Sequence, residues 1–270
     1  MDASSNFDGL NRKEYADLDP EDFECASHYD YAMLKYDGIW CRLVIANGQA
    51  KYYSRTNNLK HSRGLTTDEI KLFGDDSTVL IGEFMYGQEW AQALDRKGKF
   101  FAFDVVKWKG VDTTALNFMS RYRLLTFINL GADALLQYCM LYQKSSIQQL
   151  WKSFVLKRDY EGLVLIKSRG DYTRDLLGRM KKVFEDDVFI VGFEEGSNRL
   201  AGTLGGCLVA TVPGGEPICT VGGGFSDALR DQIWASRDSF LGKCMTITSN
   251  KRFESGSLRS PNFLRWHGEK

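Results

Sequence analysis

The feature that most constrains the fold is a run of apolar and aromatic residues from 31 to 45 that one glycine interrupts. Its pattern predicts a strand up to Lys35, a break at Gly38 and a second strand from about residue 40. An Asn-Gly pair at 47–48 follows, and this dipeptide between strand-forming segments is the strongest short signal for a β-hairpin. We therefore expect an antiparallel sheet, with Lys35 held at the end of its first strand.

The rest of the first two thirds of the chain mixes strand and helix patterns. Ser145 and Gln148 fit a capping box, in which two side chains satisfy backbone N–H groups at the start of a helix. A polar loop is expected over 168–178. The predicted elements are strands at 79–85, 100–106, 160–167 and 179–183, a helix from 114 to about 142, and a second helix over 147–155.

The sequence changes character from about residue 187, where short apolar segments alternate with glycines. Short strands with one helix in under 90 residues favour a small β-barrel of the OB type, a fold that often binds nucleic acid. The predicted class is α+β, with a first domain at 1–186 that includes an acidic arm at 1–30, and an OB-fold β-barrel at 187–270. The elements expected in the second domain are strands at 188–193, 205–212, 218–224 and 243–248 and a helix over 226–235.

The composition argues against several classes of protein. The chain has 270 residues, no apolar run near the roughly 18 residues of a membrane span, and no basic or apolar leader for export, so we expect a cytoplasmic protein. Its six cysteines include no Cys-x-x-Cys pair, which argues against a zinc cluster or a disulfide framework. They are expected to be reduced thiols in the core.

The net charge is zero, but the charges are unevenly distributed. Residues 1–34 hold nine acidic and two basic side chains, so subtraction from the totals of 35 and 35 leaves 26 acidic and 33 basic side chains in the rest. That remainder is net +7, which suits a protein that binds the phosphates of a nucleic acid. The alternative interpretation is a solvated acidic leader on a protein with an ordinary surface.

Reactive or charged residues recur in short pieces along the whole chain. Each piece alone is weak evidence, because Lys-x-Asp-Gly, paired lysines and single carboxylates are common in turns and on solvated surfaces. In order, the pieces are Lys35-Tyr-Asp37-Gly, Ser54-Arg55, Glu83, Phe101-Ala-Phe103-Asp104, Glu161-Gly-Leu-Val, Lys181-Lys182 and the segment from Arg259 to Lys270. Together they resemble the covalent nucleotidyltransferases, and most closely the small ATP-dependent DNA ligases, from Lys35 to Lys270. The segments 202–205 and 221–230 are similar to the Gly-rich strand and the helix start of the ligase OB domain.

The resemblance implies a nucleotidyltransferase domain with ATP-grasp-like antiparallel sheets and helices, followed by the OB fold. Lys35 would attack the α-phosphate of ATP to give lysyl-AMP and pyrophosphate, AMP would pass to the 5′-phosphate at a nick in duplex DNA, and the 3′-hydroxyl would seal the strand. A free lysine has a pKa near 10.4, so its surroundings must favour the uncharged amine. A cation about 5 Å away, at an effective dielectric constant of 20, does so by roughly 3 kcal/mol; the candidates are Lys181, Lys182 and a bound metal.

The resemblance also implies roles for the other residues. Phe103 would stack on the adenine ring, while Glu83 and Glu161 would hold the ribose hydroxyl and Mg²⁺, with Mn²⁺ as an alternative ion. Ser54 and Arg55 would bind the 5′-phosphate of the nick, where a planar guanidinium can bind two oxygens at once. Asp37, Lys181 and Lys182 would act with Lys35 in catalysis. The residues that would bind the nucleotide are Leu34, Trp40 and Arg42, together with Arg259, Arg265 and Lys270 at its β- and γ-phosphates.

Three positions depart from the family pattern. Trp40 stands where the family usually has an arginine, and Arg42 lies on the same face of the strand two residues later, so that either Arg42 serves or Trp40 stacks instead. Met33 replaces a carboxylate or amide that reads the adenine amino group, so that nucleotide preference must rest on backbone groups. The family ending Arg-x-Asp-Lys reads His267-Gly-Glu-Lys270, which makes its first cation dependent on pH.

The function predicted from the sequence is that of an ATP-dependent DNA ligase that acts on nicked duplex DNA as a monomer, away from membranes. The nearest alternative is an mRNA capping guanylyltransferase, which shares the lysine chemistry and an OB domain. RNA ligases generally lack this barrel, and NAD-dependent ligases carry an extra domain before the lysine and a cysteine zinc site after it. A noncatalytic protein that binds nicks or DNA ends is the alternative from a different class, although binding alone requires neither a nucleophile nor a pair of metal-binding carboxylates.

Overall fold

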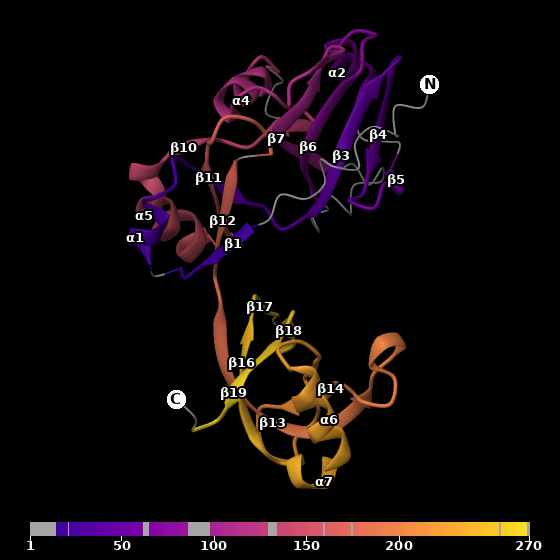
Figure 1. Cartoon of the computed structure of the whole chain (residues 1–270), viewed down its shortest axis with the longest axis vertical. Helices are drawn as coiled ribbons and strands as arrows, with labels where there is room; N and C mark the ends of the chain where they lie inside the picture. Colours follow the sequence, from indigo (N-terminus) through magenta and orange to yellow (C-terminus); the bar gives the residue numbers. More distant parts are fainter. Residues whose placement is uncertain are drawn as a thin grey trace. The chain divides into compact units, whose positions relative to one another are not determined.

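The computed structural model describes residues 15–20, 22–61, 65–85, 98–128, 134–158, 160–173, 175–253 and 255–268, so most of the predicted acidic arm lies outside it. The chain divides into two compact units, Met1–Lys181 and Lys182–Lys270 (Figure 1). No helix in the described ranges combines the length and the hydropathy that a membrane crossing requires. The six cysteines are free thiols, as predicted, although Cys25 is exposed and not in the core.

The first unit contains a large, mainly antiparallel sheet that starts with the predicted hairpin. Asn47 and Gly48 have φ values of 50° and 69°, and a type I′ turn requires positive φ at both central positions, so the hairpin prediction is confirmed. The sheet has the order β5-β4-β3-β6-β7-β8, with β9 beside β7. Its strands are β3 (Ile39–Ala46), β4 (Gln49–Tyr53), β5 (Leu59–His61), β6 (Thr78–Met85), β7 (Lys99–Trp108), β8 (Val111–Asp112) and β9 (Leu136–Tyr138).

The pairing of β6 with β7 contains a β-bulge next to the residues of interest. Ile81 pairs with Asp104 and Gly82 pairs with Ala102, so Phe103 is an extra residue without a counterpart on β6. A bulge of this kind bends a strand and changes the direction of a side chain.

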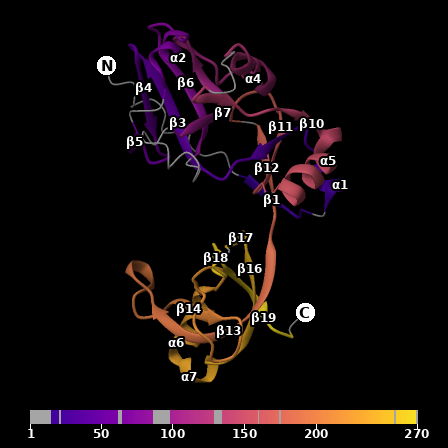
Figure 2. The same ribbon diagram turned by 180° about the vertical axis from the view of Figure 1, so that it is seen from behind.

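A second sheet of the first unit carries Lys35 at the end of one of its strands. Its order is β1-β12-β11-β2-β10, and only the β1–β12 pair is parallel. One face packs against α1 (Phe23–Ala26), α5 (Ile147–Leu150) and the π-helical turn Trp151–Leu156 (Figures 1 and 2). The opposite face contributes Met33, Ile166 and Leu177 to the core shared with the first sheet. Its strands are β1 (Tyr15–Leu18), β2 (Tyr31–Lys35), β10 (Tyr142–Gln143), β11 (Gly162–Lys167) and β12 (Leu176–Lys181).

One helix prediction and one strand prediction in this unit are wrong in extent, and one predicted helix cap is absent. The helix expected over 147–155 is confirmed, since α5 continues directly into the π-helical turn Trp151–Leu156. The helix expected from 114 to about 142 is only α4 (Phe118–Thr126), which Asn117 caps, and β9 and β10 lie in the remainder. The predicted capping box at Ser145 is absent, because the N-cap of α5 is Ser146 and its side chain makes no capping hydrogen bond. Strand β12 begins within the expected polar loop and ends two residues before the predicted end at 183.

The second unit is built on a five-stranded antiparallel sheet in the order β15-β14-β13-β16-β19. The two outer strands meet, because Gly223, just after β15, forms a bridge with Asn262 of β19, and the amide of Phe263 donates to the Gly223 carbonyl over 2.9 Å. The strands are β13 (Phe184–Glu195), β14 (Leu204–Ala210), β15 (Cys219–Val221), β16 (Cys244–Ser249) and β19 (Asn262–Trp266).

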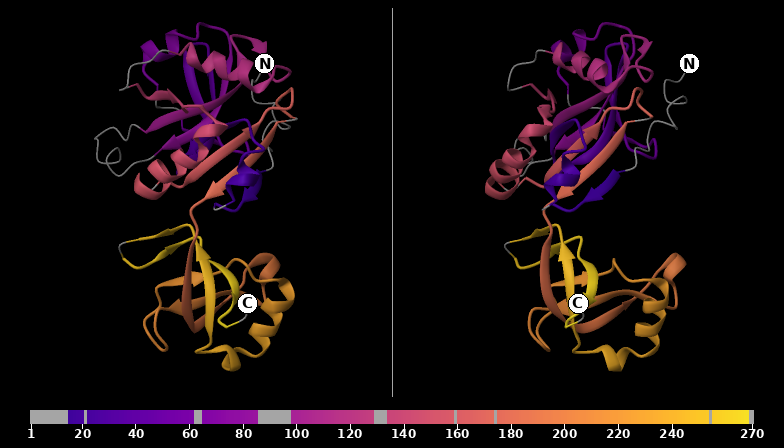
Figure 3. Two further views of the ribbon diagram at one scale, coloured as in Figure 1. Left: turned by 90° about the vertical axis from the view of Figure 1, so that its left-hand side faces the viewer. Right: turned by 60° about the vertical axis from the view of Figure 1, so that its left-hand side comes forward.

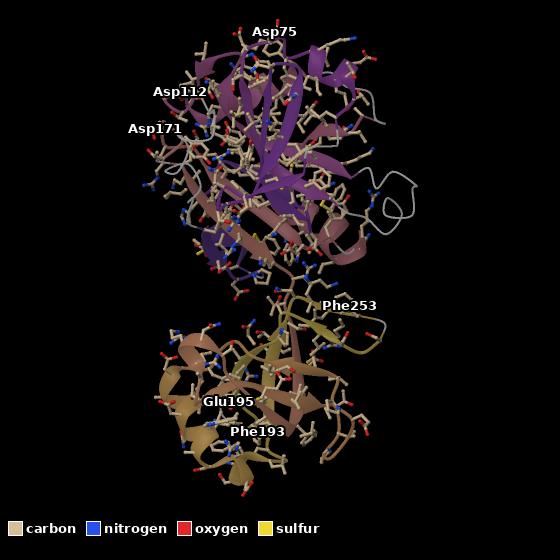
Figure 4. All side chains as sticks on the ribbon, turned by 90° about the vertical axis from the view of Figure 1, so that its right-hand side faces the viewer. Asp75, Asp112, Asp171, Phe193, Glu195 and Phe253 are labelled. Atoms are coloured by element: carbon tan, nitrogen blue, oxygen red, sulfur yellow. The ribbon has the colours of Figure 1, made fainter. Side chains whose placement is uncertain are left out.

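The predicted strands and helix of the second unit are confirmed within a few residues at each end. Helix α6 (Asp227–Ala235) begins after Ser226, whose side chain accepts a hydrogen bond from the amide of Leu229, and α7 (Arg237–Phe240) follows it. Strands β17 (Lys251–Arg252) and β18 (Leu258–Arg259) form a separate hairpin, drawn in yellow in Figure 3, and Figure 4 marks Phe253 on it.

Candidate active site

A cavity of about 160 Å³ lies between the two sheets of the first unit. Residues that are far apart in the sequence meet there because β2, β11 and β12 form one wall and β3, β6 and β7 form the other. Of the residues assigned from the sequence, the cavity is lined by Leu34, Lys35, Trp40, Arg55, Glu83, Phe103 and Lys181.

Two lysines and one glutamate meet at one end of the second sheet. Gly162 pairs with Lys35 of β2 on one side and with Lys181 of β12 on the other, so both lysines flank the start of β11. Glu161 comes directly before that start and accepts from the Nζ of Lys35 over 2.6 Å, while the Nζ of Lys181 lies 3.4 Å from its other oxygen. Glycine is required between them, because a Cβ at position 162 would lie 2.0 Å from the carbonyl oxygen of Met180.

The three charged side chains are shielded from solvent, with exposed fractions of 19% for Lys35, 16% for Glu161 and 25% for Lys181. Attraction between opposite charges is stronger in such a setting than on an open surface. The group carries one positive charge in excess, and it lies at the end of a cavity that an anion could enter. It therefore offers a positioned amine, Lys35, together with one neighbouring cation, Lys181, for phosphate oxygens.

Glu83 lies on β6 opposite Trp40 of β3 and Phe101 of β7, and its side chain faces the cavity. Burial raises the pKa of Glu83 to about 7, with a contribution from the charge of Glu161, although Lys35, the Gly38 amide and Arg55 act in the opposite direction. When Glu83 is ionised, nearby positive charges and hydrogen bonds therefore balance its negative charge only in part. Such an oxygen donor fits a hard cation like Mg²⁺, which commonly takes one or two protein carboxylates and completes its shell with phosphates and water.

Replacing Glu83 by glutamine is expected to stabilise the metal-free protein at pH 8 by about 1–3 kcal/mol. One pKa unit corresponds to about 1.4 kcal/mol, and partial exposure reduces the full effect. Because the pKa of Glu83 is raised in the folded state, its contribution to stability is complete below pH 4.5 and is lost as the pH rises through about 7. Urea unfolding in EDTA should therefore separate variant from wild type at pH 8 and not at pH 4. The exposed Glu216→Gln is the control, and a Glu83 variant less stable than wild type at pH 8 contradicts the prediction.

The cavity has an aromatic side chain on one wall and aliphatic side chains on the other. The β-bulge residue Phe103 contributes the ring, and Met33, Val164 and Ile166 lie in the opposite sheet. A slot lined in this way suits a flat heteroaromatic ring, and the charged residues described above lie at one end of it.

A buried ion-pair cluster fixes the strand that bears Phe103. Asp104 accepts from the Nε of Arg121 over 2.7 Å and from its Nη2 over 3.0 Å, and the same Nη2 donates to Asp175 over 2.7 Å. The side chains of Arg121 and Asp175 are fully buried. Arg121 thereby connects α4 with β7 and with the loop before β12, which also carries the cavity residue Tyr172.

Several residues assigned from the sequence lie outside the cavity lining. Arg42 is 1% exposed, donates through Nη2 to the Oδ1 of Asn57 and lies 5.6 Å from the Tyr53 ring. Asp37 is exposed in the segment between β2 and β3, and Ser54 accepts from the amide of Asn58 over 3.2 Å.

The remaining assigned residues belong to the second unit. The Nζ of Lys182 lies 4.7 Å from the Phe184 ring, and Arg265 forms an ion pair of 3.1 Å with Glu185. Arg259 is exposed on β18, and Lys270 lies outside the described residues. The predicted pH-dependent cation His267 contacts Asp187 over 3.0 Å; the hydrogen bonds from Thr246 and His267 lower the pKa of Asp187.

Tyr15, Tyr172 and Arg179 also line the cavity and were not assigned from the sequence. Arg179 lies two residues before Lys181 on β12, with its guanidinium 5.1 Å from the Tyr15 ring and 2.9 Å from Asp17. Alternation along β12 places residues 177, 179 and 181 on one face, so the strand predicted at 179–183 already placed Arg179 on the same face as Lys181.

No protein-family model matches the chain, and no curated protein matches it in sequence. Among solved structures, Pmar-Lig_Pre. is 22% identical with a TM-score of 0.70, over 95% of this chain and 68% of that one. Pmar-Lig_PreS3 is 22% identical with a TM-score of 0.66, over 94% of this chain and 68% of that one. A structure from a "Structure-function analysis of Lig E DNA ligases" is 18% identical with a TM-score of 0.66, over 95% of this chain and 100% of that one. The chain therefore has, over nearly its whole length, a fold that is also found in DNA ligases.

Proposed function

We propose that the chain is an ATP-dependent DNA ligase that seals nicks in duplex DNA through a lysyl-AMP adduct. The observation that carries the proposal is the convergence of Lys35, Glu161 and Lys181 at one end of a cavity that also presents Glu83 and Phe103. A protein that only binds DNA has no need for a shielded amine beside two carboxylates. The ligase-like fold supports the same conclusion.

In the first step, the Nζ of Lys35 attacks the α-phosphorus of ATP. A phosphorus–nitrogen bond forms, the bond from the α-phosphorus to the bridging oxygen breaks, pyrophosphate leaves and the amine loses a proton. Lys35 must exchange its contact with Glu161 for one with the nucleotide before it attacks. Lys181 remains beside Glu161 and offers a positive charge to the phosphate oxygens.

In the second step, an oxygen of the 5′-phosphate at the nick attacks the phosphorus of lysyl-AMP. The phosphorus–nitrogen bond breaks and Lys35 takes back a proton. The 3′-hydroxyl then attacks the 5′-phosphate, which forms the phosphodiester bond, releases AMP and frees a proton. Arg55, exposed at the cavity, binds the 5′-phosphate, because a guanidinium can donate two parallel hydrogen bonds to it.

Mg²⁺, or Mn²⁺ in its place, would be held by Glu83 and Glu161 and would neutralise charge on the phosphates. Adenine is proposed to stack on Phe103, opposite Val164 and beside Met33. Met33 offers no strong hydrogen-bond acceptor, so selection of adenine over guanine rests on other groups of the cavity.

We propose that the second unit is an OB fold that contacts the DNA and, through Arg259, Arg265 and Lys270, the β- and γ-phosphates. Its five-stranded sheet, the contact of its outer strands at Gly223 and Asn262, and α6 between β15 and β16 support this assignment. Lys182 is proposed to assist Lys181 at the triphosphate, and the enzyme is proposed to act as a monomer.

The test is to incubate the protein with Mg²⁺ and labelled ATP or GTP, denature it, and look for label on the protein. We expect a label from ATP, which nicked duplex DNA then removes as the strand is sealed. A label from GTP alone would favour a capping guanylyltransferase. No label from either nucleotide, with starting material shown to be free of AMP, would favour a noncatalytic binding protein.

Arg55→Ala is expected to slow transfer of AMP to the nick by roughly 30- to 100-fold, the loss that corresponds to a hydrogen-bonded charge contact worth about 2–3 kcal/mol. Formation of the adduct should fall much less. Single-turnover assays of each step, with purified adenylated protein for the second, measure the two effects separately. An equal loss in both steps would refute the role of Arg55 at the 5′-phosphate.

A further inference from the structure

We infer that Trp40 and Arg42 are positioning residues that hold Arg55 ready for the 5′-phosphate of the nick, and that neither contacts that phosphate itself. The inference rests on the proposed function and deepens it. Trp40 stands where the family usually has an arginine, and the inference gives Trp40 an indirect, structural role in recognition of the phosphate.

The first observation is the contact between Trp40 and Arg55. The guanidinium carbon of Arg55 lies 5.4 Å from the centre of the Trp40 ring, within the distance of a cation–π interaction, for which tryptophan is the strongest partner. Both side chains line the cavity, and Trp40 is half-buried opposite Glu83 of β6. Arg55 also acts electrostatically on Glu83, which places its charge near the reactive group.

The second observation is the register of the hairpin. Arg42 of β3 pairs with Tyr53 of β4, so continuing the same register two residues outward sets Trp40 opposite Arg55. Arg42 and Trp40 point to the same face because they are two residues apart on one strand. The guanidinium of Arg42 lies 5.6 Å from the Tyr53 ring, so this face carries two successive arginine–aromatic pairs with their partners exchanged between the strands.

The third observation is the turn that carries Arg55. Asn57, at a φ of 60°, accepts a hydrogen bond from Arg42, whose side chain is buried. The amide of Asn57 donates to the carbonyl of Ser54 over 3.0 Å, and the amide of Ser54 donates to the carbonyl of Asn58 over 2.9 Å. Arg42 thus fixes the backbone of the turn 54–58, which carries Arg55.

These contacts restrict an exposed side chain that would otherwise sample many rotamers. A guanidinium held in this way loses less conformational entropy when it binds a phosphate, and its planar donors are presented in one orientation. Trp40 therefore acts through Arg55, and this dependence can be measured.

The experiment is a double-mutant cycle on transfer of AMP from purified adenylated protein to a nick with a 5′-phosphate. Trp40→Leu is expected to slow transfer about tenfold in the wild-type background and less than about twofold in the Arg55→Ala background. Trp40→Phe should restore most of the rate, because it keeps an aromatic face. Asn57→Gly, which tolerates the positive φ but loses the acceptor for Arg42, should slow transfer about threefold.

The matched control is Trp108→Leu in the same unit. Trp108 is also half-buried with a cation near its ring, since the Nζ of Lys109 lies 5.9 Å away, but it does not line the cavity. Its effect on transfer should be the same with and without Arg55. If Trp40→Leu slows transfer by the same factor in both backgrounds, or does not slow it at all, the inference is overturned.

A second measurement does not depend on catalysis. Nicked duplexes with a 5′-phosphate and with a 5′-hydroxyl are titrated against wild-type protein and each variant. Preference for the phosphate should fall about tenfold in Trp40→Leu and remain in Trp108→Leu. An unchanged preference in Trp40→Leu contradicts the inference even if the protein forms no adduct, whereas failure of the wild type to form an adduct contradicts only the proposed ligase activity.

Discussion

Lys35→Ala is expected to abolish labelling of the protein by ATP, with a loss of at least about a thousandfold, because no step that depends on a covalent amine can proceed without it. Lys181 contacts the same carboxylate, but it belongs to β12, on the other side of β11 from Lys35. We therefore expect that Lys181 does not replace the missing amine. Intact-mass measurement after treatment with ATP and Mg²⁺ should show one added AMP on the wild type and none on the variant.

Lys167→Ala is the matched control for Lys35. Lys167 lies at the opposite end of β11 from Glu161 and pairs with Leu176, so its removal leaves intact the end of the sheet that carries Lys35 and Lys181. This variant should form the adduct at the wild-type rate. AMP attached to Lys35→Ala protein, on any residue and at a comparable rate, would show that the nucleophile is elsewhere.

Arg121→Met is expected to have the largest effect on stability, a loss of about 3–5 kcal/mol in the free energy of unfolding. Removing the guanidinium leaves Asp104 and Asp175 buried without the cation that compensates both, which is the circumstance in which breaking a buried ion pair is most destabilising. Urea unfolding followed by circular dichroism measures the loss. Adduct formation should fall as well, since Asp104 directly follows Phe103 in the cavity wall.

Arg123→Met separates the ion-pair effect from a general effect on the helix. Arg123 lies on the exposed side of the same helix α4, and methionine has a similar helix propensity, so its replacement should change stability by less than about 0.5 kcal/mol. Equal destabilisation by the two substitutions would mean that the Arg121 cluster is not what secures this part of the unit.

The spacing of nearby residues and the turn residues predicted the strands near Lys35 correctly, but they predicted the helix near residue 114 only in part. The Asn47-Gly48 turn permits few alternatives to a tight hairpin, and the prediction held in detail. Phe118, Tyr122 and Leu125 have helical spacing and lie in α4, but the predicted helix also covered β9. Residues of β9 form a strand because they pair with β7, which is distant in the sequence. Pairing between distant segments leaves no trace in the spacing of nearby residues.

The candidate site shows a similar division. Lys35, Glu161 and Lys181 were selected as separate pieces, and the sheet register explains why they meet. The sequence could not reveal that Arg42 is buried against Asn57, because that contact depends on the path of a turn in three dimensions. Arg179 was not assigned, although it shares a face with Lys181 within the strand predicted at 179–183.

The unmatched residue in β7 has a consequence for engineering this protein. Deleting Phe103 would let Ile81 and Gly82 face consecutive partners and would remove one of the two interruptions in this ladder; the other, at Val106 between the partners of Val79 and Leu80, would remain. We expect the resulting protein to be more stable to heat and to bind a purine nucleotide more weakly. In the proposed site the irregular backbone directs the Phe103 ring into the cavity, so selection for thermal resistance alone would remove this irregularity.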